Sequence, residues 1–204
     1  MDFFSFSQAT LIFLVANVVI SVIGFSNPGF VNWGLLNVRA VLKNQEWHRV
    51  LVAGFLHADP GHLFVNMLTL FFFGPYMEQI LGSQNFYLVY LGALIAGNIG
   101  ALLVHSREPQ YSALGASGAV SGILFSFCLF EPFEMIYLFA ILPIPALLYG
   151  VLFVAYSLYG MRAQNDNIGH DAHLFGAIAG VVITILLAPA ALSIFLSEIS
   201  GLLG

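Results

Sequence analysis

Three short polar clusters interrupt an otherwise apolar sequence, and each carries side chains that can take part in chemistry. In the first cluster His62 and Asn66 lie four residues apart, so they share one face of a helix. The second cluster is centred on Ser117, and the third ends in His173. Polar and ionisable side chains are expensive inside a membrane-spanning segment, so each of these residues is a candidate functional residue.

Ser117 lies in a glycine-rich stretch, Gly115–Gly118, whose sequence is Gly-Ala-Ser-Gly. The glycines allow the backbone to turn and leave space around the hydroxyl. A helix that begins there presents unpaired backbone N–H groups, which can hold an oxyanion. A serine, a neutral imidazole that can accept its proton, and amide donors are the components of a nucleophilic hydrolase. Small residues alone would indicate helix packing, but the histidines and Asn66 of the other clusters favour a nucleophilic serine.

The composition indicates a membrane protein. Of the 204 residues, 60% are hydrophobic and only 7% are charged, whereas soluble domains carry about 25% charged residues. A water-soluble globular protein is therefore excluded. Five Lys and Arg against ten Asp and Glu leave no basic patch for nucleic acid. The single cysteine, Cys128, excludes an internal disulfide and a thiolate metal cluster.

The apolar stretches predict the membrane topology. A spanning helix needs about 20 mostly apolar residues to cross about 30 Å of hydrocarbon. Six long runs qualify approximately and predict an all-α membrane protein: Gln8–Phe25, His62–Leu81, Phe86–Val104, Ser117–Phe130, Met135–Tyr159 and Ala172–Ala188. We expect a single domain over residues 1–204. The polar clusters open the second, fourth and sixth spans from the same side, so helix packing can bring them together.

The segments between and after the predicted spans differ from the spans in composition or in length. Ser26–Asp59 mixes Trp and charged residues with apolar ones, which is typical of a segment in the membrane interface. After Pro189 the tail has helical apolar spacing but is too short to span, so an interfacial helix is predicted. Phe153 and Tyr156 of the fifth span, with the loop Gly160–Gly169, are candidates for a gate that admits substrate.

In combination, these motifs resemble those of the rhomboid intramembrane serine proteases. The matching elements are Glu46-Trp47-His48-Arg49, His57-x4-His62-x3-Asn66, Gly115-Ala116-Ser117-Gly118 and Ala172-His173-x2-Gly176-x3-Gly180. Their order and their placement on spans two, four and six match the family. The resemblance covers roughly residues 45–185, and its specificity comes from the combination, since a lone Gly-x-Ser-Gly carries little information.

The resemblance implies specific roles for these residues. Ser117 is implied as the nucleophile and His173 as the general base of a dyad that has no third, acidic member. His62, Asn66 and the backbone N–H of Ser117 are implied to stabilise the tetrahedral oxyanion. Structural positions of the motifs are implied for Glu46, Arg49, His57, Gly115, Gly118, Gly176 and Gly180.

Two neighbouring positions need separate interpretation. Some family members carry an aromatic residue four positions after the serine, which packs on the catalytic imidazole, whereas this chain has Ser121 there. Asp171, two residues before His173, is interpreted as a helix N-cap rather than as a triad acid.

The fold implied by the resemblance is a six-transmembrane-helix bundle of rhomboid type, with its site in a water-filled cavity open to the extracytoplasmic side. The implied function is an intramembrane serine endopeptidase that cleaves transmembrane helices near that surface without a metal or other cofactor. Its expected partners are transmembrane protein substrates and membrane lipid, with no nucleic acid and an open oligomeric state. The expected location is a cell membrane, the bacterial inner or plasma membrane, as a multi-pass protein.

The positions of the lysine and arginine residues are relevant to the orientation of the chain in the membrane. All five Lys and Arg residues fall in the first, third and fifth loops. The positive-inside rule alone would place those loops in the cytoplasm, whereas the family orientation places them outside. We adopt the family orientation, because five charges in partly embedded loops are a weak bias.

Other functions stay open at this point. A non-proteolytic rhomboid-like protein would bind client transmembrane helices, although such proteins lack the serine or the histidine. A channel or proton-coupled transporter would use His57, His62 and His173 as proton relays. A metal site is the least favoured, because the sequence has no His-Glu-x-x-His motif.

Overall fold

The chain folds into a predominantly helical structure with two small two-stranded sheets. The computed structural model describes residues 7–138, 141–163 and 169–201. In chain order the elements are α1 (Gln8–Ser26), α2 (Pro28–Gly34), β1 (Leu36–Asn37), α3 (Val38–Leu42), α4 (Arg49–Val52), η1 (Ala53–Phe55), α5 (Pro60–Val104), β2 (Ser112–Ala113), α6 (Ser117–Phe130), β3 (Met135–Leu138), β4 (Leu142–Pro145), α7 (Ala146–Ala163), α8 (His170–Leu187) and α9 (Ala190–Gly201). Four of the described helices, α1, α5, α7 and α8, are long and apolar enough to span a membrane. A helical membrane protein is therefore supported.

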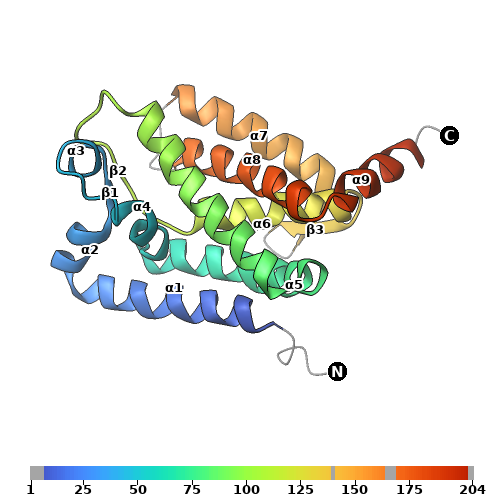
Figure 1. Cartoon of the computed structure of the whole chain (residues 1–204), viewed down its shortest axis with the longest axis horizontal. Coiled ribbons are helices and arrows are strands. Elements are labelled where there is room, and N and C mark those ends of the chain that lie inside the picture. Colours follow the sequence, from blue (N-terminus) through green and yellow to red (C-terminus); the bar gives the residue numbers. More distant parts are fainter. Residues whose placement is uncertain (1–6, 139–140, 164–168, 202–204) are drawn as a thin grey trace.

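Helix α5 has 45 residues but is broken at Gly82. The φ of 75° and ψ of 153° at Gly82 lie outside the helical region, in a conformation that glycine tolerates best. Figure 1 shows the two legs of α5 running in different directions from this break. The legs correspond to the predicted spans His62–Leu81 and Phe86–Val104. The predicted turn Gly82–Asn85 is thus reduced to one non-helical residue.

The prediction of a continuous fifth span over Met135–Tyr159 is wrong at its start. Strands β3 and β4 form an antiparallel hairpin that pairs Met135 with Pro145. Pro143 and Pro145 lie in β4, and a proline in a helix interior removes a hydrogen bond and clashes with the preceding turn. Helix α7 therefore begins only after the second proline.

The long first loop folds into short helices and a strand rather than one extended segment. Strand β1 pairs antiparallel with β2 of the third loop, with Leu36 opposite Ala113 and Asn37 opposite Ser112. A small apolar core joins this loop to the end of α5 and the start of α8, and it consists of Leu36, Val38, Val41, Val50, Ala53, Ala101, Leu102 and Ala172. The first loop is thereby fixed to the helix ends that surround the candidate site.

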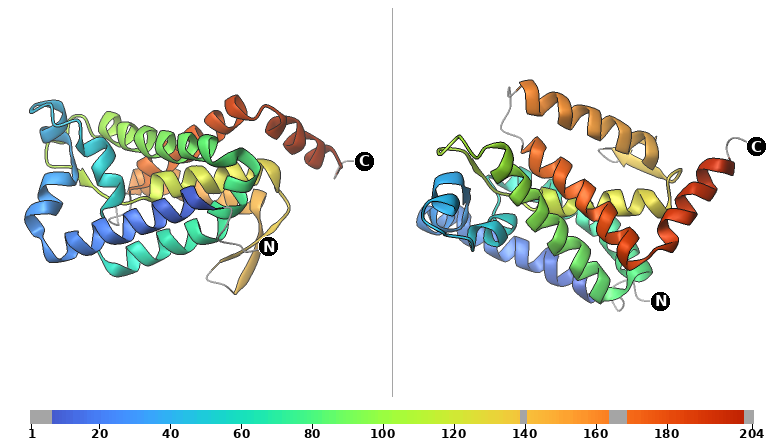
Figure 2. Two further views of the ribbon diagram at one scale, coloured as in Figure 1. Left: turned by 60° about the horizontal axis from the view of Figure 1, so that its bottom comes forward. Right: turned by 45° about the horizontal axis from the view of Figure 1, so that its top comes forward.

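Helix α6 lies at the centre of the bundle. Eleven of its 14 residues are buried, and Figure 2 shows it between α5 and α8. The predicted bounds Ser117–Phe130 match those of α6, and α8 covers most of the predicted Ala172–Ala188. Helix α9 has 12 residues and follows Pro189, as expected for the tail helix. The central position of α6 places its N-terminal serine inside the fold.

Candidate active site

A cavity of about 870 Å³ lies where the N-terminal ends of α5, α6 and α8 meet. Its lining includes His62 and Asn66 from α5, Ser117 from α6 and His173 from α8. Asn66 is buried, and the other three are half-buried. The fold therefore collects the three polar clusters of the sequence around one cavity.

Close contact between α6 and α8 brings two of these helix starts together. A Cβ atom at Gly176 would collide with the backbone of Gly118. A Cβ atom at Gly118 would in turn lie 3.2 Å from the carbonyl oxygen of Ala172. Ser117 and His173 are the chain neighbours of Gly118 and Ala172, so the same contact sets the serine and the histidine at adjoining ends of the two helices.

Two further glycine contacts maintain this approach. A Cβ atom at Gly180 would collide with Gly122 of α6, about one turn further along both helices. On the α5 side, a Cβ atom at Gly97 would lie 2.7 Å from the carbonyl oxygen of Ala172. Small residues thus let three helices pack backbone to backbone beneath the cavity.

Gly115 forms the wall of the cavity between α5 and α6. Its φ of 133° is a conformation that side-chain-bearing residues rarely adopt. A Cβ atom there would lie 2.9 Å from Nε2 of His62 and 3.7 Å from Oγ of Ser117. The Gly115 N–H also donates to the carbonyl of Ala53 at 2.9 Å. Both the backbone conformation and the space around His62 therefore require glycine.

His62 and Asn66 occupy the first turns of α5. Asp59 is the N-cap of this helix, and its carboxylate accepts a hydrogen bond from the His62 N–H at 2.9 Å. The Asn66 side-chain amide donates to the His62 carbonyl at 3.0 Å. This bond uses one of the two amide hydrogens of Asn66. The capping and the bond together orient this end of α5 toward the cavity.

His57 connects α1 to the residue before the candidate nucleophile. Its Nδ1 lies 2.8 Å from Oγ of Ser21, and its Nε2 accepts from the N–H of Ala116 at 3.4 Å. The Ser21 hydroxyl donates to the carbonyl of Phe55 at 3.0 Å. Burial lowers the pKa of His57 to about 4, and the neighbouring His62 adds to this effect. A neutral imidazole is the form that can accept the Ala116 bond.

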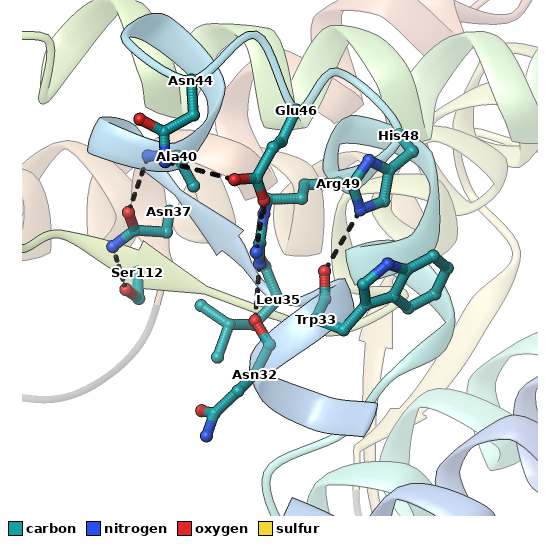
Figure 3. A network of polar contacts seen from close by, with 10 residues as sticks. All are labelled: Asn32, Trp33, Leu35, Asn37, Ala40, Asn44, Glu46, His48, Arg49 and Ser112. Atoms are coloured by element: carbon teal, nitrogen blue, oxygen red, sulfur yellow. Dashed lines mark hydrogen bonds and ion pairs between the residues drawn. The ribbon is translucent and has the colours of Figure 1, made fainter. Parts of the chain in front are cut away.

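Arg49 ties the first loop together away from the cavity (Figure 3). Its guanidinium donates to the carbonyls of Asn32 and Leu35 at 2.7 and 2.9 Å. It also pairs with the Glu46 carboxylate at 2.6 and 2.7 Å. The hydrogen bond from Arg49 lowers the pKa of Glu46. These contacts are structural, because they close the loop that carries β1 and α4.

Asp171 differs from its sequence interpretation, since the N-cap of α8 is Gly169. Its Oδ2 lies 3.2 Å from Nε2 of His105, and its Oδ1 accepts from the Tyr111 hydroxyl at 3.4 Å. The rings of His105 and Tyr111 stack with centroids 3.7 Å apart. Burial, together with Asp171, raises the pKa of Tyr111. No sequence pattern links these distant residues, and sequence reasoning missed the cluster.

The structure also places the residues predicted to form a gate. Phe153 and Tyr156 of α7 contact His173 and His170 of α8, respectively. His170 is buried against Gly160 of α7 and is the first residue of α8, rather than a loop residue. Residues 164–168 of the predicted gate loop lie outside the described residues. In the parts of the chain that are described, no group of three or more His, Cys, Asp and Glu side chains could hold a metal ion.

Several known proteins are similar to this chain in sequence. The chain is 35% identical over 151 residues to the putative rhomboid protease YdcA of Bacillus subtilis (strain 168), which covers 71% of this chain and 69% of that protein. It is 28% identical over 183 residues to RHOMBOID-like protein 12, mitochondrial, of Arabidopsis thaliana, which covers 77% of this chain and 54% of that protein. It is also 32% identical over 104 residues to Inactive RHOMBOID-like protein 8 of Arabidopsis thaliana, which covers 51% of this chain and 30% of that protein.

The relatives differ in length, location and activity by name. The chain spans about half the length of the mitochondrial relative. The names include a bacterial protein and a mitochondrial one, so the similarity supports a multi-pass membrane protein and does not support the bacterial plasma membrane in particular. They also include a putative protease and an inactive protein. Residues 44–190, more than half of the chain, match the model of the rhomboid domain, and the chain therefore belongs to the rhomboid family.

Proposed function

We propose that this chain is an intramembrane serine endopeptidase that cleaves transmembrane helices of membrane-protein substrates near the extracytoplasmic surface. The observation that carries the proposal is the shared cavity, which is lined by Ser117, His173, His62 and Asn66 at the starts of three helices. A hydroxyl, an imidazole and amide donors around one space are the groups that acyl transfer requires.

The proposed reaction begins with attack of Ser117 Oγ on the scissile carbonyl carbon while His173 takes the hydroxyl proton. The resulting oxyanion is held by His62, Asn66 and the Ser117 backbone N–H. Collapse of this intermediate breaks the C–N bond, and His173 passes its proton to the leaving amine. Water then attacks the acyl carbon while His173 takes its proton, and the ester bond to Ser117 breaks as His173 returns that proton to Oγ. Asp171 is left out of the dyad, because its carboxylate lies against the His105 ring and accepts a hydrogen bond from the Tyr111 hydroxyl.

The proposed membrane arrangement has six spans: α1, the two legs of α5, α6, α7 and α8. Helix α6 has 14 residues, and at 1.5 Å per residue it is about 21 Å long, shorter than the roughly 30 Å hydrocarbon core. A helix of that length starts below the membrane surface when its other end reaches the opposite face. This depth suits cleavage of a helix inside the membrane, with water supplied through the cavity.

A substrate helix hides its carbonyls in backbone hydrogen bonds, so it must unwind locally before Ser117 can attack. Substrates with helix-weakening residues near the cut should therefore be preferred. Membrane lipid is the other expected partner, and no cofactor takes part in the proposed reaction. Because only the neutral imidazole accepts a proton, cleavage should decline when His173 becomes protonated.

The second candidate function is a non-proteolytic rhomboid-like protein that binds client transmembrane helices. The chain is 32% identical over 104 residues to a protein that is named as inactive, and this similarity supports a non-proteolytic function as the alternative. In either role, a client or substrate helix would lie against this cavity. The two functions differ in whether Ser117 reacts.

The test is cleavage of a model transmembrane substrate in liposomes by the wild type and by Ser117→Ala and His173→Ala variants. We expect each variant to lose activity by a factor of about 1000 or more, and we expect only the wild type to be labelled by a fluorophosphonate. Ser121→Ala is the matched control, because Ser121 lies one turn further on the same helix and is buried. A Ser117→Ala variant that cuts as well as the wild type would sink the assignment, whereas helix binding without cleavage by the wild type would support the second candidate.

A further inference from the structure

An aromatic side chain from α7 lies on the imidazole of His173. The ring centroids of Phe153 and His173 are 6.0 Å apart, and the ring planes are inclined by only 27°. This is within the distance range of stabilising offset-stacked aromatic pairs. Phe153 is half-buried and belongs to a different helix from both Ser117 and His173.

The Phe153 ring is itself held from two sides. Phe125 of α6 packs edge-on against it, with centroids 5.2 Å apart and planes at 60°. Tyr149, about one turn earlier on α7, lies 5.9 Å from it. The neighbouring rings restrict the rotation of Phe153, so Phe153 presents a fixed surface to His173.

We propose that Phe153 is a positioning residue for His173 and sets the orientation of the imidazole in the cavity. The inference rests on the proposed protease function. The terminal torsion of histidine is broad and roughly two-fold, so an adjacent ring narrows the orientations that the imidazole adopts. Ser121 has no ring to offer from α6. The ring that positions His173, the proposed general base, therefore comes from Phe153 of α7. It takes the place of an aromatic residue on α6 at position 121.

The most direct test compares a variant that lacks the aromatic ring at position 153 with a variant that keeps it. Phe153→Leu should lower kcat by about two- to tenfold with little change in KM, because the loss falls on orientation of the base. Phe153→Tyr keeps a ring of the same shape and should restore kcat to within about twofold of the wild type. Tyr159→Leu is the matched control, since it removes an aromatic ring from the same helix at a side chain that is 63% exposed; its kcat should stay within about twofold of the wild type.

A second readout does not depend on activity. In protein labelled with ¹³C at histidine, the His173 ring signal, assigned with His173→Gln, should move in Phe153→Leu, because the ring current of the phenyl group is lost. It should stay near its wild-type position in Tyr159→Leu. An unchanged His173 signal and an unchanged kcat in Phe153→Leu would overturn the proposal, as would an equal loss of kcat in Phe153→Leu and Tyr159→Leu.

The two proposals fail in distinguishable ways. If the wild type neither cleaves substrate nor is labelled at Ser117, the protease function fails, and the histidine signal still reports whether Phe153 orients His173. If the wild type is active and Phe153→Leu behaves like it in both measurements, only the role of Phe153 is rejected.

Discussion

His57 and Ala116 are joined by a hydrogen bond in which the Ala116 N–H donates to Nε2 of His57 at 3.4 Å. On the other side of the ring, Ser21 donates its own proton to the Phe55 carbonyl, so Nδ1–H of His57 donates to Ser21 Oγ. The imidazole is therefore neutral, with its lone pair on Nε2. It ties α1 and the first loop to the residue that precedes Ser117.

This relationship predicts how stability depends on pH. The pKa of His57 is about 4 because of burial, below the unfolded value of about 6.5. The unfolded chain therefore binds more protons between these values, and stability should fall as pH is lowered from about 6.5 toward 4. The loss should be about 3 kcal/mol, measured by thermal unfolding in detergent. His57→Gln should remove most of this slope.

The control for this pH effect is His48→Gln, because His48 is exposed in the first loop. This variant should keep the full slope of the wild type. A His57→Gln variant whose stability depends on pH as steeply as that of the wild type would show that another group causes the loss.

Gly176→Ala should destabilise the bundle by about 1–3 kcal/mol, because the new methyl group would collide with the Gly118 backbone and push α8 from α6. The shift would also move His173 relative to Ser117, so cleavage should fall by about tenfold or more. Thermal unfolding and cleavage assays measure the two effects.

Gly150→Ala serves as the matched control, because a methyl group there would meet only Phe125 at 3.7 Å, an ordinary contact. It should leave both stability and cleavage near the wild-type values. Equal behaviour of the Gly150 and Gly176 variants would contradict the close packing of α6 on α8.

The sequence was informative where one physical signal dominates. Hydrophobic length located α1, both legs of α5, α6 and α8, and the cost of polar groups in lipid singled out the residues that line the cavity. Hydrophobic length gave a wrong prediction for Met135–Tyr159. The average hydropathy of this segment does not show that Pro143 and Pro145 block a helix. Apolar composition does not distinguish a strand from a helix, so the β3–β4 hairpin was missed.

Contacts between distant segments were beyond sequence reasoning for a different reason. The pairs His105–Asp171 and Phe153–His173 arise only when α5, α7 and α8 pack together, and no local spacing encodes them. Ser121 did indicate that the usual aromatic support of His173 is missing, but the sequence offered Phe153 only as a gate candidate and not as a neighbour of His173. Periodicity predicts which face of a helix is buried, and the partner on that face follows from the three-dimensional packing.

The His105–Asp171 contact should stabilise the start of α8. Asp171 is 3% exposed, and removing either partner leaves the other polar group buried, so Asp171→Asn and His105→Gln should each cost about 2 kcal/mol. The double variant should cost clearly less than the sum, which a double-mutant cycle of unfolding in detergent would measure. Asp171→Asn should keep kcat within about threefold of the wild type at a temperature where it is folded. A loss of kcat as large as that of Ser117→Ala would instead make Asp171 a member of the catalytic group.

Arg49→Lys tests whether the first loop depends on the shape of the guanidinium or only on its charge. The guanidinium reaches two carbonyls, of Asn32 and Leu35, while also pairing with Glu46. A lysine ammonium cannot reproduce this fork, so the variant should lose about 2 kcal/mol of stability although its charge is kept. Glu46→Gln should be milder, since Glu46 is half-buried and its replacement leaves both carbonyl bonds of Arg49 in place. Once folded, both variants should cleave substrate at nearly the wild-type kcat, because the network lies away from the cavity. Thermal unfolding beside a cleavage assay separates these effects, and an Arg49→Lys variant as stable as the wild type would mean that charge alone holds the loop.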